Sequence, residues 1–222
     1  MSNPTISVNK LGEYLVTNPT RRKRIIQDQK DPSEFIVTRY KDAKDSIIDF
    51  IINGYNDTFI TNGISQISAK KSSSTFADND KKTSLECLGV ISSNSFPVLN
   101  GVTFIKLISH KKLEIEGVDI SIAPDVIIKG IDKKGKHFVG AIKIHISKSN
   151  TLNEEAKKYV ATLLHQHIET NVAQSNEYAS HEHCFSIDIF TKKFETAPKS
   201  YKRRRLQIAS ACEEIALWWS KL

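Results

Sequence analysis

The sequence has few of the residues that build disulfide-rich or membrane-spanning proteins. It holds three cysteines, Cys87, Cys184 and Cys212, an odd number set far apart in apolar surroundings. Such cysteines are typical of buried thiols in a reducing compartment, so we expect no disulfide framework and a cytoplasmic location. No apolar run reaches the ~18 residues that a membrane helix needs. The first residues also lack the basic and apolar segments of a signal peptide.

Acidic residues are outnumbered, with 25 Asp and Glu against 32 Lys and Arg, which gives a formal net charge of +7. An excess of this sign favours a polyanionic partner. Two blocks of four consecutive basic residues stand at expected helix starts: Arg21, Arg22, Lys23 and Arg24, and Lys202, Arg203, Arg204 and Arg205. Consecutive helical positions cannot all face a core, so these side chains face either water or nucleic-acid phosphate, with DNA the expected partner.

The distribution of apolar residues divides the chain into three parts. Residues 1–54 are expected to form an N-terminal helical region, whose strongest helix runs from Pro32 or Ser33 to Ile52. Residues 55–77 are polar and are expected to form a linker or loop. Residues 78–222 follow the order helix, three strands, helix, strand, helix, which predicts an α/β core with a central mixed sheet flanked by helices.

Local signals refine the expected α/β core. The alternation of apolar residues over 113–122 breaks at Gly117, which indicates a β-bulge. Thr151 followed by Glu154 has the spacing of a capping box and predicts the start of a long helix. The stretch 184–190 alternates as a strand, and a last helix is expected over about 199–219.

The stretch 114–147 carries the residue pattern with the most chemical meaning. Asp125 follows Pro124 at the start of an expected strand, a turn is expected over 132–135, and Lys143 lies inside the next apolar strand. An aspartate and a lysine placed in this way can meet across a hairpin. A carboxylate that holds a hard cation beside a lysine that stabilises an anion suits phosphodiester hydrolysis.

These residues resemble the motif of the PD-(D/E)XK nuclease superfamily. Pro124-Asp125 matches the "PD", and Ala141-Ile142-Lys143 stands where "(D/E)XK" belongs. The resemblance covers about residues 78–191 and implies a restriction-endonuclease-like core. It implies metal-dependent hydrolysis of nucleic acid, with Mg²⁺ or Mn²⁺ held by Asp125 and the transition state stabilised by Lys143.

Ala141 departs from the family pattern, because alanine has no oxygen to bind a cation. The missing ligand would then come from Glu86, on the preceding helix, or from Glu116 or Glu114 before Asp125. Magnesium sites usually need more than one carboxylate or phosphate. The alternative is an inactive nuclease-fold module that binds nucleic acid or docks a protein through Trp218 or Trp219. His145 is a further candidate metal ligand or base, and a homo-oligomer stays open.

Overall fold

The computed structural model describes residues 3–31, 39–71, 74–91, 95–106 and 112–222, and a five-stranded mixed sheet forms its centre. The order across the sheet is β2 (Val102–Ile105), β5 (Val126–Ile131), β6 (His137–His145), β7 (Glu177–Asp188) and β8 (Lys193–Thr196). Only β6 and β7 are parallel, and the other neighbours are antiparallel. The predicted α/β class with a mixed sheet is confirmed.

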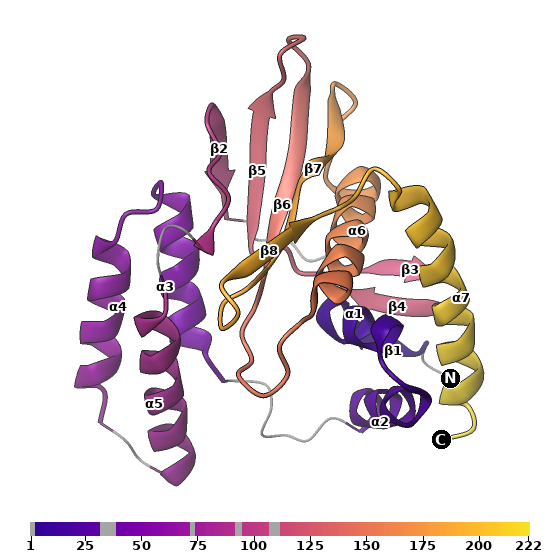
Figure 1. The fold of residues 1–222 in the computed structure, drawn as a ribbon, viewed down its shortest axis with the longest axis horizontal. Coiled ribbons are helices and arrows are strands. Elements are labelled where there is room, and N and C mark those ends of the chain that lie inside the picture. The colour runs from indigo at the N-terminus through magenta and orange to yellow at the C-terminus, as the bar shows by residue number, and fades with distance from the viewer. Residues whose placement is uncertain (1–2, 32–38, 72–73, 92–94, 107–111) are drawn as a thin grey trace.

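Helices cover both faces of this sheet (Figure 1). On one face lie α3 (Lys41–Ile52), α4 (Thr58–Ala69) and α5 (Thr75–Gly89), with α4 packed on its two neighbours. The other face is covered by α6 (Glu154–Asn171), against which α1 (Val8–Val16) and α7 (Tyr201–Trp219) pack. The helix α2 (Pro19–Lys30) contacts α1 and α7.

A smaller three-stranded sheet lies beside α7. Its order is β1 (Thr5–Ser7), β4 (Val118–Ser121) and β3 (Leu113–Ile115), with β1 parallel to β4. The hairpin β3–β4 turns at Glu116 and Gly117, whose φ angles are 48° and 71°. The expectation of a β-bulge at Gly117 is therefore wrong. Positive φ at both positions is the geometry of a tight hairpin turn, which breaks the alternation in the same way.

Two apolar clusters sandwich the large sheet because successive strand residues face opposite sides. Val139 and Ala141 belong to the cluster under α6 and α1, whereas Ile142 and Ile144 belong to the cluster under α3 and α5. All four side chains are at most 2% exposed. At about 1.5–3 kcal/mol for each large buried side chain, these two clusters are the main source of stability.

The described part of residues 1–54 is mainly helical, as expected, with α1, α2 and α3 and one short strand, and these elements are spread over both faces of the large sheet. The short strand, β1, extends the small sheet and α1 packs on α6, while α3 covers the opposite face of the large sheet. The expected helix start at Pro32 or Ser33 lies outside the described residues. Within the described part, α3 begins at Lys41, after Tyr40 in a left-handed conformation with φ of 62°.

The expected polar linker over residues 55–77 is also corrected, because residues 58–69 form α4. Only Ile60, Gly63 and Ile67 of this helix are buried, and they repeat at the spacing of one helical face. Three buried residues in twelve leave the average hydrophobicity of this segment low. Its composition therefore favoured a loop, although the segment is a helix. A smaller correction concerns α6, whose cap is Asn153, which accepts a hydrogen bond from the Ala156 N–H at 2.8 Å, and not Thr151.

The three cysteines are buried free thiols, as the sequence predicts. Burial raises the pKa of Cys87, Cys184 and Cys212 to about 12, so none of them is a reactive thiolate at neutral pH. In the part of the chain that the structure describes, no helix has the length and apolar character needed to cross a bilayer.

Candidate phosphate and metal site

Asp125 and Lys143 meet at one end of the large sheet, as the hairpin pattern predicts. Val126 of β5 pairs with Ile142 of β6, which places Asp125 opposite Lys143. The Asp125 backbone N–H donates to the Ile142 carbonyl at 2.9 Å, and the Lys143 Nζ lies 3.5 Å from the Asp125 Oδ1. The predicted approach of the two side chains is confirmed.

The Asp125 carboxylate has a closer partner that the sequence did not indicate. The Nζ of Lys44, on α3, lies 2.7 Å from Oδ1, and the Ile144 backbone N–H donates to Oδ2 at 2.7 Å. The Asp125 side chain is only 5% exposed, whereas that of Lys44 is 35% exposed. Asp125 therefore joins the sheet end to α3, and both of its oxygens accept hydrogen bonds or ion pairs.

Lys143 is a buried lysine whose hydrogen bonds are made within the hairpin. Its Nζ donates to the Ala123 carbonyl as well as to Asp125, so it holds both sides of Pro124. Burial lowers the pKa of Lys143 below its ordinary value, the Asp125 charge opposes this shift, and the Lys44 charge adds to it. The desolvation free energy of this buried ammonium group is offset by its attraction to the Asp125 carboxylate.

Ala141 occupies a position where an acid would face an apolar core. Its side chain is fully buried among Val139, Leu163 and the other residues under α6. A carboxylate here would lose hydration without a cation in reach, at a cost of several kcal/mol. The alanine therefore suits the packing of this chain.

In the described ranges of the chain, none of the three glutamates proposed to replace the missing acid forms an ion pair or hydrogen bond with Asp125 or its partners, Lys44 and Lys143. Glu86, on α5, forms an ion pair with Lys148, and its side chain is 40% exposed. Glu116 lies in the β3–β4 turn beside α7, where its charge makes a contribution, after burial, to the raised pKa of Cys212. Glu114 is exposed on β3. All three lie in settings that give them other partners or open water.

A second buried acid, Asp188, lies at the same end of the sheet and was missed by the sequence analysis. It is fully buried, and its oxygens accept from the Leu152 N–H at 2.7 Å and the Thr191 N–H at 3.0 Å. Asp188 ends β7 and Asp125 precedes β5, with β6 between them. Both oxygens of Asp188 are thus occupied by backbone N–H donors, and its register position opposite His145 lies two residues along β6 from Lys143, which faces Asp125.

His145 lies between these acids at the end of β6, opposite Asp188. Its Nε2 is 2.7 Å from the Asn150 carbonyl and donates to it. Burial lowers the pKa of His145, against opposing contributions from that carbonyl and from Asp188. The imidazole is therefore neutral at physiological pH and holds the loop that leads to α6, which is a structural role.

The residues at this end of the sheet do not fit Mg²⁺ or Mn²⁺ as they stand. A hard cation needs several oxygen ligands, but the oxygens of Asp125 face two ammonium groups and an amide. Among the described residues, no group of three His, Cys, Asp or Glu side chains is placed to hold a metal. The arrangement can stabilise the sheet end and present positive charge, and we derive no metal-dependent step from it.

The basic block on α2 is divided into a paired and an unpaired half. Arg21 pairs with Glu13 at 2.6 Å, and Arg22 pairs with Glu214 at 3.2 Å. Lys23 and Arg24 are exposed, and no acid of the described residues forms an ion pair with them. Two of the four predicted phosphate contacts are therefore committed to protein partners.

The block on α7 is divided in the same way. Arg204 pairs with Glu155 and Arg205 with Glu169, both on α6, at 2.8 and 2.7 Å. Lys202 and Arg203 are exposed, and neither forms an ion pair with an acid in the described ranges. No acid lies near enough along α7 to neutralise this block, but acids on the adjacent helix α6 neutralise half of it.

The two tryptophans proposed as docking residues lie at the end of α7. Trp218 is 41% exposed and borders a cavity of about 270 Å³ with Tyr14 and Ile26. Trp219 is half-buried and packs against the cluster under α6. Of the two rings, Trp218 is therefore the more open to a partner, and the Lys221 Nζ lies over it at 5.9 Å from the ring centroid.

We predict that Asp125→Asn lowers the free energy of unfolding by about 3–5 kcal/mol, because it leaves Lys143 as an unpaired buried charge. The pKa of folded Lys143 would fall further below its ordinary value of 10.5. At pH values between that lowered pKa and 10.5, the unfolded variant binds more protons than the folded one. The loss of unfolding free energy should therefore shrink as pH rises towards 10.5. Denaturant unfolding across pH measures both effects.

The matched control is Asp45→Asn, an exposed α3 acid whose oxygen lies 3.9 Å from Lys106, which should cost less than about 1 kcal/mol. The double variant Asp125→Asn/Lys143→Met should recover most of the loss, because the unpaired charge is then removed. A double variant no more stable than Asp125→Asn would show that the buried charge pair is not the cause.

Comparison with known proteins gives no family for this chain. No protein-family model, no curated protein and no solved structure matches it.

Proposed function

We propose that the chain binds nucleic acid, with DNA the expected partner, through phosphate contacts and without hydrolysing it. The observation that carries the proposal is a set of four exposed cations on two helices in contact, none of which forms an ion pair with an acid in the described ranges: Lys23, Arg24, Lys202 and Arg203. Phosphate contacts of this kind supply most of the sequence-independent affinity for a duplex.

The proposed contacts come from two places on a fixed pair of helices, since Lys202 and Arg203 lie in the first turn of α7 and α2 packs further along it. Arg22 pairs with Glu214, and Lys30 donates to the Trp219 carbonyl at 3.1 Å, so α2 is held against the C-terminal half of α7. The paired arginines thus fix the two helices, and the unpaired residues supply the charge. Basic side chains on a rigid frame have a smaller entropic cost of ordering on binding than those on mobile segments.

The order of the core elements supports a nuclease-like fold as part of this proposal. The elements α5, β2, β5, β6, α6 and β7 follow the order helix, three strands, helix, strand that the resemblance implies, with β3 and β4 inserted after β2. A restriction-endonuclease-like core would place nucleic acid near the Asp125 end of the sheet. The saturated Asp125 and the buried Ala141 argue against hydrolysis at this place, and the proposed phosphate contacts lie on α2 and α7 instead.

We predict that Lys23→Ala/Arg24→Ala and Lys202→Ala/Arg203→Ala each weaken duplex binding about equally for unrelated sequences. A variant that makes fewer phosphate contacts releases fewer counterions when it binds. The negative slope of log affinity against log salt should therefore become shallower by about 0.9 for each lost contact. Fluorescence anisotropy from low to moderate salt measures the affinity and the slope.

The control is Lys133→Ala/Lys134→Ala, which removes the same charge from the exposed β5–β6 turn. This variant should keep the salt slope of the wild type, because a general loss of net charge breaks no phosphate contact. Unchanged slopes in both test variants, or an equal loss in the control, would contradict the proposed surface.

A nuclease is the second candidate, favoured by the approach of Lys143 to Asp125 at 3.5 Å on neighbouring strands. This is the one feature of the catalytic resemblance that the geometry reproduces. Incubation of a labelled duplex with Mg²⁺ or Mn²⁺ separates the two candidates. Cleavage by the wild type that is lost in Asp125→Asn would favour the nuclease, and an intact duplex supports binding alone.

A further inference from the structure

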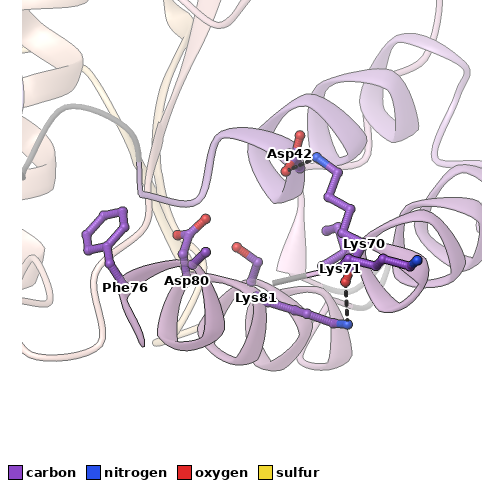
Figure 2. Close-up of a pocket in the computed structure, with 9 residues that line it drawn as sticks. Asp42, Lys70, Lys71, Phe76, Asp80 and Lys81 are labelled. Carbon is purple, nitrogen blue, oxygen red and sulfur yellow. Dashed lines mark hydrogen bonds and ion pairs between the residues drawn. The ribbon is translucent and has the colours of Figure 1, made fainter. Parts of the chain in front are cut away.

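Charged side chains also meet at places away from the Asp125 end of the sheet. One is the cavity of about 240 Å³ between α3, α4 and α5 (Figure 2), where Lys70 pairs with Asp42 at 2.7 Å and Lys81 donates to the Lys70 carbonyl at 2.9 Å. Another is the junction of α7 with α6 and β7. This junction differs from the cavity because an arginine donates there to a buried histidine.

His165, on α6, is a buried ring with one partner at each nitrogen. It is 2% exposed. The Arg205 Nη2 lies 2.9 Å from its Nδ1, and the Ala179 carbonyl of β7 lies 3.2 Å from its Nε2. A guanidinium group can only donate a hydrogen bond, and a carbonyl can only accept one. The two contacts therefore require a neutral ring whose Nδ1 is bare and whose Nε2 carries the proton.

Arg205 joins α7 to α6 through this ring and one carboxylate. Its Nη1 pairs with Glu169 on α6 at 2.7 Å, and its side chain is 22% exposed. Its guanidinium carbon also lies 5.0 Å from the centroid of the Tyr201 ring. The Nε is buried and has no hydrogen-bond partner within the described ranges. The two acceptors that hold the guanidinium on α6 are thus a carboxylate and the lone pair of a histidine.

Each element that meets at the junction brings charged or titratable groups that face His165: Arg205 and Tyr201 on α7, His181 on β7 and Glu169 on α6 itself. The centroid of the His165 ring lies 4.6 Å from that of Tyr201 and 6.3 Å from that of His181. The His181 Nδ1 donates to the Ala197 carbonyl at 3.0 Å. A further proton on His181 would occupy Nε2 and leave this bond intact.

The electrostatic setting agrees with a neutral His165. Burial lowers the pKa of His165 below its ordinary value of 6.5. The hydrogen bond to the Ala179 carbonyl opposes this shift, and the Arg205 charge adds to it. The ring is therefore uncharged at physiological pH, which is the state that its two partners require.

A second proton on His165 would break the junction. At Nδ1 it would point at the Arg205 guanidinium, so a hydrogen bond would be replaced by repulsion between two cations. His165 also lies four residues before Glu169, a spacing at which side chains on one helix meet. The imidazolium would therefore compete with Arg205 for the Glu169 carboxylate.

We propose that this junction is a pH-sensitive switch, in which protonation of His165 loosens the first two turns of α7 from α6 and β7. The proton comes from solvent and occupies Nδ1, and Arg205 loses one of its two acceptors. The later turns of α7 stay packed through their buried residues, Ile208, Ala211, Cys212 and Ile215. The loosened turns carry the basic block Lys202–Arg205, and the switch does not depend on what this block binds.

The direction of the pH effect follows from the lowered pKa of His165. In the loosened form the ring meets water, and its pKa returns towards 6.5. Between the lowered pKa and 6.5, the loosened form binds more protons than the packed form, so loosening becomes more favourable as pH falls. The opening equilibrium should shift by up to about tenfold per pH unit in this window.

Two measurements on the wild-type protein test the switch. An NMR titration of the His165 ring should give a pKa below 6.5. Amide hydrogen exchange, corrected for intrinsic rates, should show lower protection of Leu206 and Gln207 at about pH 5.5 than at about pH 7.5. Leu163 and Leu164, which are fully buried on α6, should keep their protection over the same range.

Two variants separate the switch from a merely structural contact. His165→Gln keeps one acceptor and one donor but does not titrate, so it should remove the pH dependence of α7 protection. Arg205→Gln removes the guanidinium, so it should raise the pKa of His165 towards its ordinary value and reduce the pH dependence. The matched control is Lys199→Gln, which removes an exposed cation before α7 and should leave both quantities unchanged.

A third variant, His181→Gln, assigns the proton to one of the two histidines. It should retain most of the pH dependence of α7, and its loss in this variant would overturn the assignment to His165. The proposal would also be overturned by unchanged pH dependence in His165→Gln, or by a wild-type His165 that titrates at or above 6.5. An equal loss of protection at Leu163 and Leu164 would contradict it as well, because the whole fold would then be opening.

Discussion

The packing of α3 against the end of the large sheet depends on the ion pairs and the hydrogen bond of the buried Asp125 carboxylate. The carboxylate binds Lys44 on α3, Lys143 on β6 and the Ile144 N–H, and so joins the helical layer to the end of the sheet. Lys143 in turn holds the Ala123 carbonyl on the approach to β5. Removing the carboxylate would leave two ammonium groups facing each other, one of them buried, which is why the acid is needed for the fold whatever its function.

The same constraint gives the acid pattern that resembles a nuclease a structural role. In a metal site, Asp125 would share a cation with a second acid, but position 141 is filled by a methyl group inside the core under α6. Asp188 is committed to the backbone before α6 and after β7. Positive charge has instead accumulated on the helices, where half of each basic block fixes neighbouring elements and half faces solvent.

Whether a contact can be predicted from the sequence depends on how far apart its residues lie along the chain. The approach of Asp125 and Lys143 was predictable because a short turn links their strands. Lys44 was not, because its contact with Asp125 spans 81 positions and no local pattern marks it. The helix α4 was missed because three buried residues suffice to hold it against α3. The pairing of Arg204 and Arg205 with α6 acids was hidden for the same reason as Lys44, since an ion pair between two helices leaves no periodic signal in the sequence.

The central claim is that Asp125 is an ion-pair partner and not a metal ligand, and the Ile144 backbone amide reports on it directly. This N–H donates to the Asp125 Oδ2 at 2.7 Å, so a paramagnetic ion on the carboxylate would broaden its resonance strongly. The measurement is a series of ¹H–¹⁵N spectra of the wild-type protein with increasing Mn²⁺. The account predicts that the Ile144 signal keeps its intensity relative to amides at the far end of the sheet, such as Lys134. Selective loss of the Ile144 signal at low Mn²⁺ would contradict it.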